Sequence, residues 1–164
     1  MFRILLFVIL IQAAYSGEPA SRLYDSWKSD AAATNAYLGK HANLNEMQKR
    51  IFSDFFGKSV ITFRPDGSGF IELASNSFTM EDGRVRELPA SKTDFTFKIL
   101  DEAESQIVIR TTFAEGIFTD HPFAILKLHD ADTYSVSLSD GFAEINGREF
   151  FKRLEAPAPP IGEE

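Results

Sequence analysis

The stretch FFGKSVITFRPDGSGFIELA, residues 55–74, marks the point where the pattern of the chain changes from helix to strand. Gly57 fits the left-handed residue that commonly ends a helix. From Ser59 onward, Ile61 and Phe63 alternate with Val60, Thr62 and Arg64. This period of two is typical of a strand. The turn 65–67, with sequence PDG, has proline where a fixed φ helps and glycine where φ must become positive. The stretch therefore predicts the end of a helix followed at once by a β-hairpin.

Two helices are predicted before this hairpin. Ser29 or Asp30 is placed to cap the first helix, and Gly39 marks its expected end. Asn43 and Glu46 have the spacing of a capping box at the start of the second helix. Because the two predicted helices are short and adjacent, we expect a helical hairpin with one apolar side. The apolar positions of the second helix at helical spacing are Leu44, Met47, Ile51 and Phe55, widened by Phe52 and Phe56.

Strand patterns and short turns occupy the chain after residue 58. Residues 75–80, SNSFTM, are expected to extend the second strand of the hairpin. Residues 123–128, FAILKL, have apolar residues at both alternating sets of positions. That second pattern predicts a strand covered on both faces. The predicted strands lie at a first segment near Trp27 and then at 59–64, 70–73, 85–88, 95–99, 107–113, 123–128, 134–138 and 148–154.

So many consecutive antiparallel strands must close or curl, because an open sheet would expose its edges. The predicted fold is mainly β: an antiparallel β-barrel of about eight strands with an N-terminal helical pair over one mouth. The alternative is an α+β fold in which the helices pack in a strongly curved antiparallel sheet.

The two ends of the chain differ in composition from its middle. Residues 1–16, with Arg3 before a short apolar run, have the form of a signal peptide, which predicts export to the periplasm or the extracellular space. Residues 17–22 are predicted to be a flexible lead and residues 23–155 a single lipocalin-like domain. Residues 156–164, rich in proline and acid, are predicted to be disordered.

Composition narrows the classes of function. The chain has no cysteine, so disulfides, cysteine nucleophiles and cysteine metal sites are excluded. Its formal net charge of −7 disfavours nucleic-acid binding, which needs a basic face. The apolar run near the N-terminus is shorter than the roughly 20 residues that a spanning helix needs, so no stable membrane span is predicted.

The order of these parts resembles the calycin group, which comprises lipocalins, fatty-acid-binding proteins and small lipocalin-like bacterial barrels. The resemblance rests on Trp27 in an early strand, the helical segments 30–41 and 43–56, the hairpin 58–73 and the closing strand 148–155. Fatty-acid-binding proteins likewise place a helical pair between their first two strands. The resemblance implies a barrel that binds a small apolar molecule.

The closing strand of such barrels has an aromatic residue two positions before a basic one, as Phe151 precedes Arg153. Two departures qualify the resemblance. The glycine that usually lies two residues before the tryptophan is Asp25 here. The arginine–tyrosine pair that binds a carboxylate in fatty-acid carriers is not reproduced, because Phe151 or a neighbour takes the tyrosine position, and this argues against a fatty-acid ligand.

Sixteen phenylalanines in a chain of this length need a large core, a cavity or a partner to cover them. We expect an apolar cavity with an aromatic lid, or else a barrel filled by side chains. An acidic head group would be anchored by Arg110, Arg153 or Lys127 if one of them faces inward. The predicted ligand-binding residues are Phe63, Phe95, Phe97, Phe113, Tyr134, Phe151 and Arg153 in the cavity, with Phe52 and Phe56 in the lid.

The motifs of catalysis and metal binding are not found in the sequence. His41, His121 and His129 lack the spacing of metal ligands, and there is no GxSxG motif. The sequence therefore predicts no catalytic residues, no metal and no cofactor. The leading hypothesis is a non-enzymatic barrel that binds a small apolar or amphipathic ligand. The alternatives are a solid-core protein with a protein or cell-envelope partner and, after that, an enzyme of unknown reaction.

Overall fold

The computed structural model of the chain describes residues 20–79, 83–113, 122–138 and 146–155. The predicted signal peptide 1–16 and the predicted tail 156–164 lie outside these residues, as does His121. Within the described residues, no helix is long and apolar enough to cross a membrane.

Within the described residues, ten strands and two helices follow one another. They are β1 (Asp25–Ser29), α1 (Ala31–His41), α2 (Glu46–Phe55), β2 (Ser59–Phe63), β3 (Ser68–Leu73), β4 (Asn76–Thr79), β5 (Val85–Leu88), β6 (Ser91–Ala103), β7 (Gln106–Phe113), β8 (Phe123–Leu128), β9 (Thr133–Ser137) and β10 (Arg148–Arg153).

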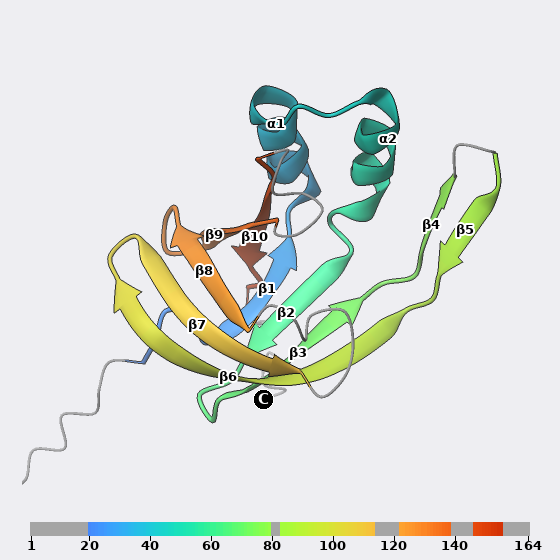
Figure 1. Cartoon of the computed structure of the whole chain (residues 1–164). Helices are drawn as coiled ribbons and strands as arrows, with labels where there is room; N and C mark the ends of the chain where they lie inside the picture. Colours follow the sequence, from blue (N-terminus) through green and yellow to red (C-terminus); the bar gives the residue numbers. More distant parts are fainter. Residues whose placement is uncertain (1–19, 80–82, 114–121, 139–145, 156–164) are drawn as a thin grey trace, which may run out of the picture.

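Eight of the strands form a closed barrel in the order β1-β10-β9-β8-β7-β6-β3-β2 (Figure 1). All pairs are antiparallel, and β1 closes the ring because it pairs with both β10 and β2. The predicted antiparallel barrel of eight strands is confirmed, and the alternative of an open curved sheet is wrong. Closure satisfies the backbone groups that an open sheet would expose at its edges.

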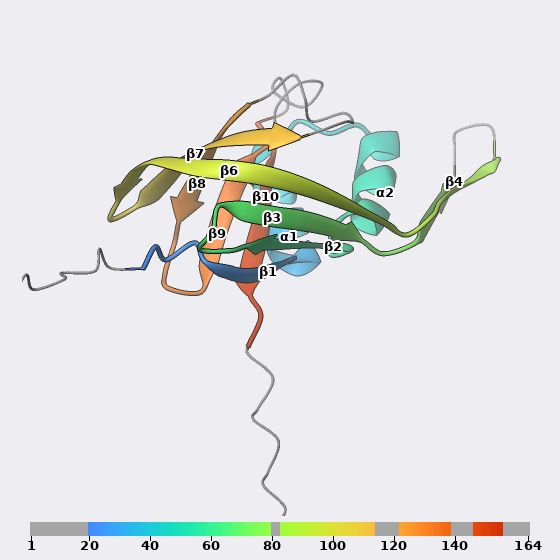
Figure 2. The ribbon, with the colours of Figure 1, turned by 90° about the horizontal axis from the view of Figure 1, so that it is seen from below.

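The strands β4 and β5 pair with each other as a separate hairpin, which we call the arm. Seen from below, β3 and β6 run side by side toward this arm (Figure 2). The expectation that residues 75–80 extend the second strand is therefore wrong. Residues 76–79 leave the barrel wall and pair with 85–88 instead.

The hairpin that decides the fold has the predicted geometry. Gly57 and Gly67 both adopt positive φ, at 84° and 81°. Gly57 follows α2, and the Gly67 N–H donates to the Arg64 carbonyl across the turn (3.1 Å). Both positions favour glycine because side chains rarely tolerate this backbone conformation.

The helix ends differ in part from prediction. Asp30 caps α1 as expected, its side chain accepting from the Ala33 N–H. Gly39 does not end this helix, which continues to His41. The cap of α2 is Asn45 rather than Asn43. A capping box with Gln48 satisfies two backbone N–H groups that the first turn leaves without helical partners.

The helices do not pack as the expected pair over one mouth. Both stand at one end of the barrel, α1 beside β10 and α2 on the side of the arm (Figure 1). The Thr34 hydroxyl of α1 accepts from the Phe150 N–H (3.0 Å), whereas the Asp54 carbonyl of α2 accepts from the Asn76 side chain (2.7 Å). Among the described side chains, the helices meet in a small cluster centred on Leu38, Phe52 and Phe56. Each helix is therefore fixed mainly by a different strand.

The main core fills the barrel at the end away from the helices. Its buried residues are Leu23, Trp27, Phe63, Phe95, Phe97, Ile107, Ile109, Leu126, Leu128, Tyr134 and Phe151. Two apolar predictions fail. Phe55 is 48% exposed rather than part of the buried stripe of α2, and β8 is covered on one face only. Its outward residues Phe123 and Ile125 are 61% and 58% exposed.

Candidate functional site

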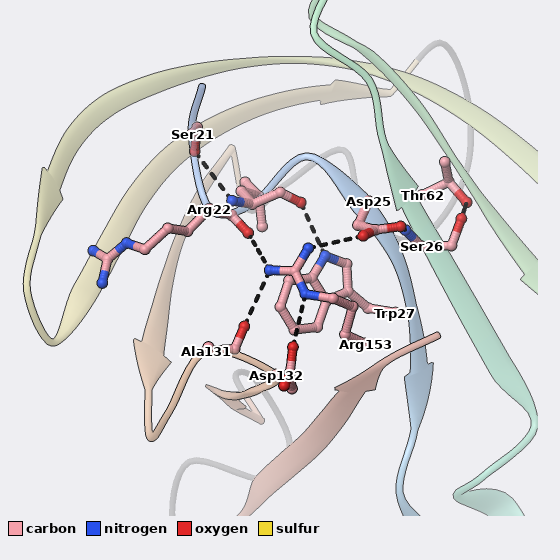
Figure 3. A network of polar contacts seen from close by, with 10 residues as sticks. Ser21, Arg22, Asp25, Ser26, Trp27, Thr62, Ala131, Asp132 and Arg153 are labelled. Atoms are coloured by element: carbon pink, nitrogen blue, oxygen red, sulfur yellow. Dashed lines mark hydrogen bonds and ion pairs between the residues drawn. The ribbon is translucent and has the colours of Figure 1, made fainter. Parts of the chain in front are cut away.

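Arg153, a predicted ligand-binding residue, lies at the barrel end away from the helices. Its guanidinium carbon is 4.3 Å from the centre of the Trp27 ring, so the two form a cation–π pair (Figure 3). The Trp27 indole N–H donates to the Leu23 carbonyl (2.9 Å), which holds the ring in place. The two residues lie on paired strands, β1 and β10, in direct register.

The donors of Arg153 are directed at groups of this chain. Its Nη2 donates to the carbonyls of Arg22 (2.8 Å) and Ala131 (3.1 Å). Its Nη1 and Nε pair with the carboxylates of Asp25 (2.8 Å) and Asp132 (3.1 Å). Asp25, at the place where the resemblance expects glycine, is thus an ion-pair partner of this arginine. The network gives Arg153 a structural part in closing this end of the barrel.

The predicted cavity residues are brought together, but at the closed end they contact one another. The Phe63 ring centre lies 5.1 Å from that of Phe97 and 5.6 Å from that of Phe95. Tyr134 stacks on Phe151 with ring centres 5.0 Å apart. Phe113 is half-buried against this core. The predicted lid residues Phe52 and Phe56 are buried in the second cluster with Leu38, apart from the main core.

Several apolar side chains of the inner wall are only partly buried where they pack against the main core. Ile61 and Ile71 lie opposite each other in β2 and β3, on the face of the buried Trp27. Val136 lies opposite the buried Leu126, and Phe113 opposite the buried Phe95. Register places these side chains on the inward face, yet all of them are only half-buried. The inward wall of the barrel therefore keeps exposed apolar surface.

Glu149 is a half-buried carboxyl residue on the inner face of the barrel. It precedes Phe151 by two positions in β10 and pairs with Val136 of β9. The Ser29 hydroxyl donates to Glu149 Oε1 (2.6 Å), and the Ser59 hydroxyl does so at 3.4 Å. Ser29 also accepts from the Gly57 N–H (2.9 Å), which links the carboxyl group to the end of α2. Alternation with Phe151 and Arg153 was the sequence signal that could have identified Glu149, and it was missed.

The environment of Glu149 is unusual for a carboxyl group. Burial raises its pKa to about 7, and the two serine hydroxyls offset part of that effect. No basic side chain among the described residues contributes to stabilising its charge. Enclosed carboxylates ordinarily have a cationic partner, because desolvation strongly disfavours an unpaired charge.

Tyr134 adds a second unusual polar atom. It is completely buried, and its hydroxyl has no hydrogen-bond partner among the described residues. Burial and then the nearby charge of Glu149 raise its pKa well above the ordinary value. Buried hydroxyls nearly always have a partner, so this atom is a candidate for contact with a buried water molecule.

His129 and Ser135 form a pair that resembles part of a catalytic triad. The His129 Nε2 lies 2.9 Å from the Ser135 hydroxyl, and Arg148 Nη1 donates to the same hydroxyl (3.3 Å). Burial, followed by the charges of Lys127 and Arg148, lowers the pKa of His129. Ser135 is completely buried, so its hydroxyl is not exposed to a substrate. The pair therefore has the contacts of a structural element.

Other predicted anchors and ligands are placed elsewhere. Arg110 and Lys127 are exposed, so they do not supply an inward base for an acidic head group. Among the described residues, no group of three or more histidine, aspartate or glutamate side chains could hold a metal ion. A surface depression of about 580 Å³ lies where α2 meets β2 and β4, and Phe56 is the one predicted site residue that lines it.

The family of the chain is not established by comparison with known proteins. No protein-family model and no curated protein matches it. The interior of the barrel, and Glu149 in particular, is therefore the basis for a functional proposal.

Proposed function

We propose that this protein is an exported, non-enzymatic, lipocalin-like barrel that binds a small apolar or amphipathic ligand. The observation that supports this proposal best is the contrast between fully buried and half-buried residues of the inner wall. Trp27 and Tyr134 are completely buried, whereas Ile61, Ile71 and Val136, which pack against the same core, keep exposed apolar surface. Exposed apolar surface on an inner wall suits an apolar ligand, since burying it is favourable.

In this proposal the ligand lies in the half of the barrel next to the helices. The network around Arg153 and the packed rings of Phe63 and Phe97 hold the opposite end together. The apolar part of the ligand contacts Ile61, Ile71 and Val136.

Binding of a hydrophobic dye by delipidated protein tests the proposal. Val136→Phe adds a ring on the inward wall, and Ser137→Phe adds the same ring on the outward face of the same strand. We expect dye fluorescence to rise with wild-type protein and with Ser137→Phe, and to fall severalfold with Val136→Phe. Native mass spectrometry of protein purified from its own host would then detect the natural ligand. Equal dye binding by both variants, or no binding by wild-type protein, would contradict the proposal.

One observation favours a second candidate function, binding of a protein partner by the outer face of β8. Phe123 and Ile125 lie on this face with more than half of their surfaces exposed. Exposed apolar patches often mark interaction sites. If this face is the functional one, a Phe123→Ser/Ile125→Ser variant will keep its dye binding and its thermal stability but lose a partner that wild-type protein retains in affinity purification from the host.

A further inference from the structure

We propose that the ligand is an amphipathic amine whose ammonium group pairs with Glu149 inside the barrel. This inference rests on the proposed function and adds to it the charge of the ligand. It names the inward polar group of β10 as the determinant of specificity.

Glu149 lacks a counter-ion among the described residues. Glu149 accepts hydrogen bonds from Ser29 and Ser59, and both donors are neutral. No basic side chain among the described residues stabilises its charge, and burial raises its pKa. A cationic ligand would supply the charge that the protein does not provide, in surroundings where a charge-assisted hydrogen bond is strong.

Glu149 also has an oxygen that accepts no hydrogen bond from the described residues. Both serine hydroxyls donate to Oε1, which leaves Oε2 without such a donor. An ammonium group donates three hydrogen bonds, so it can use this oxygen.

Apolar surface lies beside the carboxyl group of Glu149. Val136 pairs directly with Glu149 across β9 and β10, and it is half-buried. Ser59, which donates to Glu149, lies two residues before the half-buried Ile61 on the same face of β2. An alkyl chain can therefore follow these side chains while its charged end stays at Glu149.

The same geometry disfavours an acidic ligand. A carboxylate head group would meet the like charge of Glu149. The arginine closest in sequence on the inward face, Arg153, is engaged with Asp25, Asp132 and two carbonyls at the other end of the barrel. This agrees with the missing carboxylate-binding pair noted in the sequence.

Calorimetric titration with three probes of equal chain length tests the inference: n-octylamine, 1-octanol and octanoate at pH 7.5. In wild-type protein we expect the amine to bind about tenfold tighter than the alcohol, as one charge-assisted contact implies, and octanoate to bind most weakly. Glu149→Gln should lower the affinity for the amine to that for the alcohol and leave the affinity for the alcohol unchanged. Glu87→Gln, an exposed glutamate of the arm, is the matched control and should keep the wild-type order.

The outcomes separate the inference from the proposed function. Equal binding of amine and alcohol by wild-type protein would overturn the amine inference and leave the carrier function standing. Failure of all three probes to bind would overturn both. The comparison of probes in wild-type protein decides the matter even if Glu149→Gln does not fold, and circular dichroism of the variant shows whether it does.

Discussion

Arg153 stacks on Trp27 with its guanidinium carbon 4.3 Å from the ring centre, and both residues are held by hydrogen bonds to the backbone of the segment that precedes β1. Trp27 donates to the Leu23 carbonyl, and Arg153 donates to the Arg22 carbonyl. This pair therefore joins the first strand, the last strand and the N-terminal segment at one end of the barrel. It explains how two strands more than 120 residues apart in sequence are fixed side by side.

Arg153→Met should destabilise the barrel. It removes the cation–π contact and the hydrogen bonds to the Arg22 and Ala131 carbonyls, while keeping much of the apolar stem. We expect the free energy of unfolding in urea to fall by about 3 kcal/mol. Arg110→Met, at an exposed arginine of β7, is the control and should change it by less than about 0.5 kcal/mol. Similar values for the two variants would show that the Arg153 network contributes little.

Glu149 should make stability depend on pH between about 4.5 and 7. Its folded pKa of about 7 lies above the ordinary value of 4.5, so the carboxyl group is protonated in both states at low pH and loses its proton more easily when unfolded. Its contribution is therefore fully present below about pH 4.5 and is lost as pH rises through 7. At about 1.4 kcal/mol for each pKa unit, the loss is roughly 3 kcal/mol.

The measurement is the difference in unfolding free energy between wild-type protein and Glu149→Gln at pH 4.5, 6 and 8. A hydrogen bond from Lys152 lowers the pKa of Asp30, so Asp30 changes stability with pH in the opposite direction. Because both proteins contain Asp30, its contribution cancels in the difference. The difference should shift by roughly 3 kcal/mol in favour of the variant as pH rises. A constant difference would show that the carboxyl group is not enclosed.

Gly69→Ala should be strongly destabilising, although φ at this position is not the reason. An added Cβ would lie 2.5 Å from the Phe95 ring and 2.6 Å from the Thr62 carbonyl, so the barrel wall would have to move. We expect a loss of about 2–3 kcal/mol, typical of overpacking. Gly39→Ala is the matched control, because its Cβ meets nothing within 4 Å inside α1. Gly39→Ala should raise the free energy of unfolding by about 0.5–1 kcal/mol. Thermal unfolding measures both variants, and a Gly69→Ala protein as stable as Gly39→Ala would contradict the prediction.

Asn45→Ala should weaken α2 at its start. The substitution removes the acceptor for the Gln48 N–H and thus half of the capping box. A loss of about 1 kcal/mol is expected, measured by urea unfolding and by faster amide hydrogen exchange in α2. Asn43→Ala tests the residue that the sequence pattern favoured as the cap and should have little effect. A larger effect at Asn43 would restore the predicted boundary.

Local patterns predicted much of the fold, and they failed where a contact distant in sequence decides the outcome. The turn at Gly67 and the end of α2 at Gly57 follow from backbone preferences that each short segment carries itself. The separation of the two helices does not follow from local preferences, because α1 is fixed by Phe150 and α2 by Asn76, both distant in sequence from the helices they hold. Strand alternation likewise gave a weak signal for the covered face of FAILKL, since both faces carry large apolar residues and only Lys127 marks the outward one.

The sequence by itself determined the positions of the turns, the change from helix to strand near Gly57 and the run of strands that follows, because these depend on φ preferences and on periodicity within short segments. Tertiary structure alone decided which inward residues meet. It stacked Arg153 on Trp27, and it placed the hydroxyls of Ser29 and Ser59 on the carboxyl group of Glu149. The physical reason is that desolvation and pairing depend on groups that closure of the barrel brings together from β1, β2, β9 and β10.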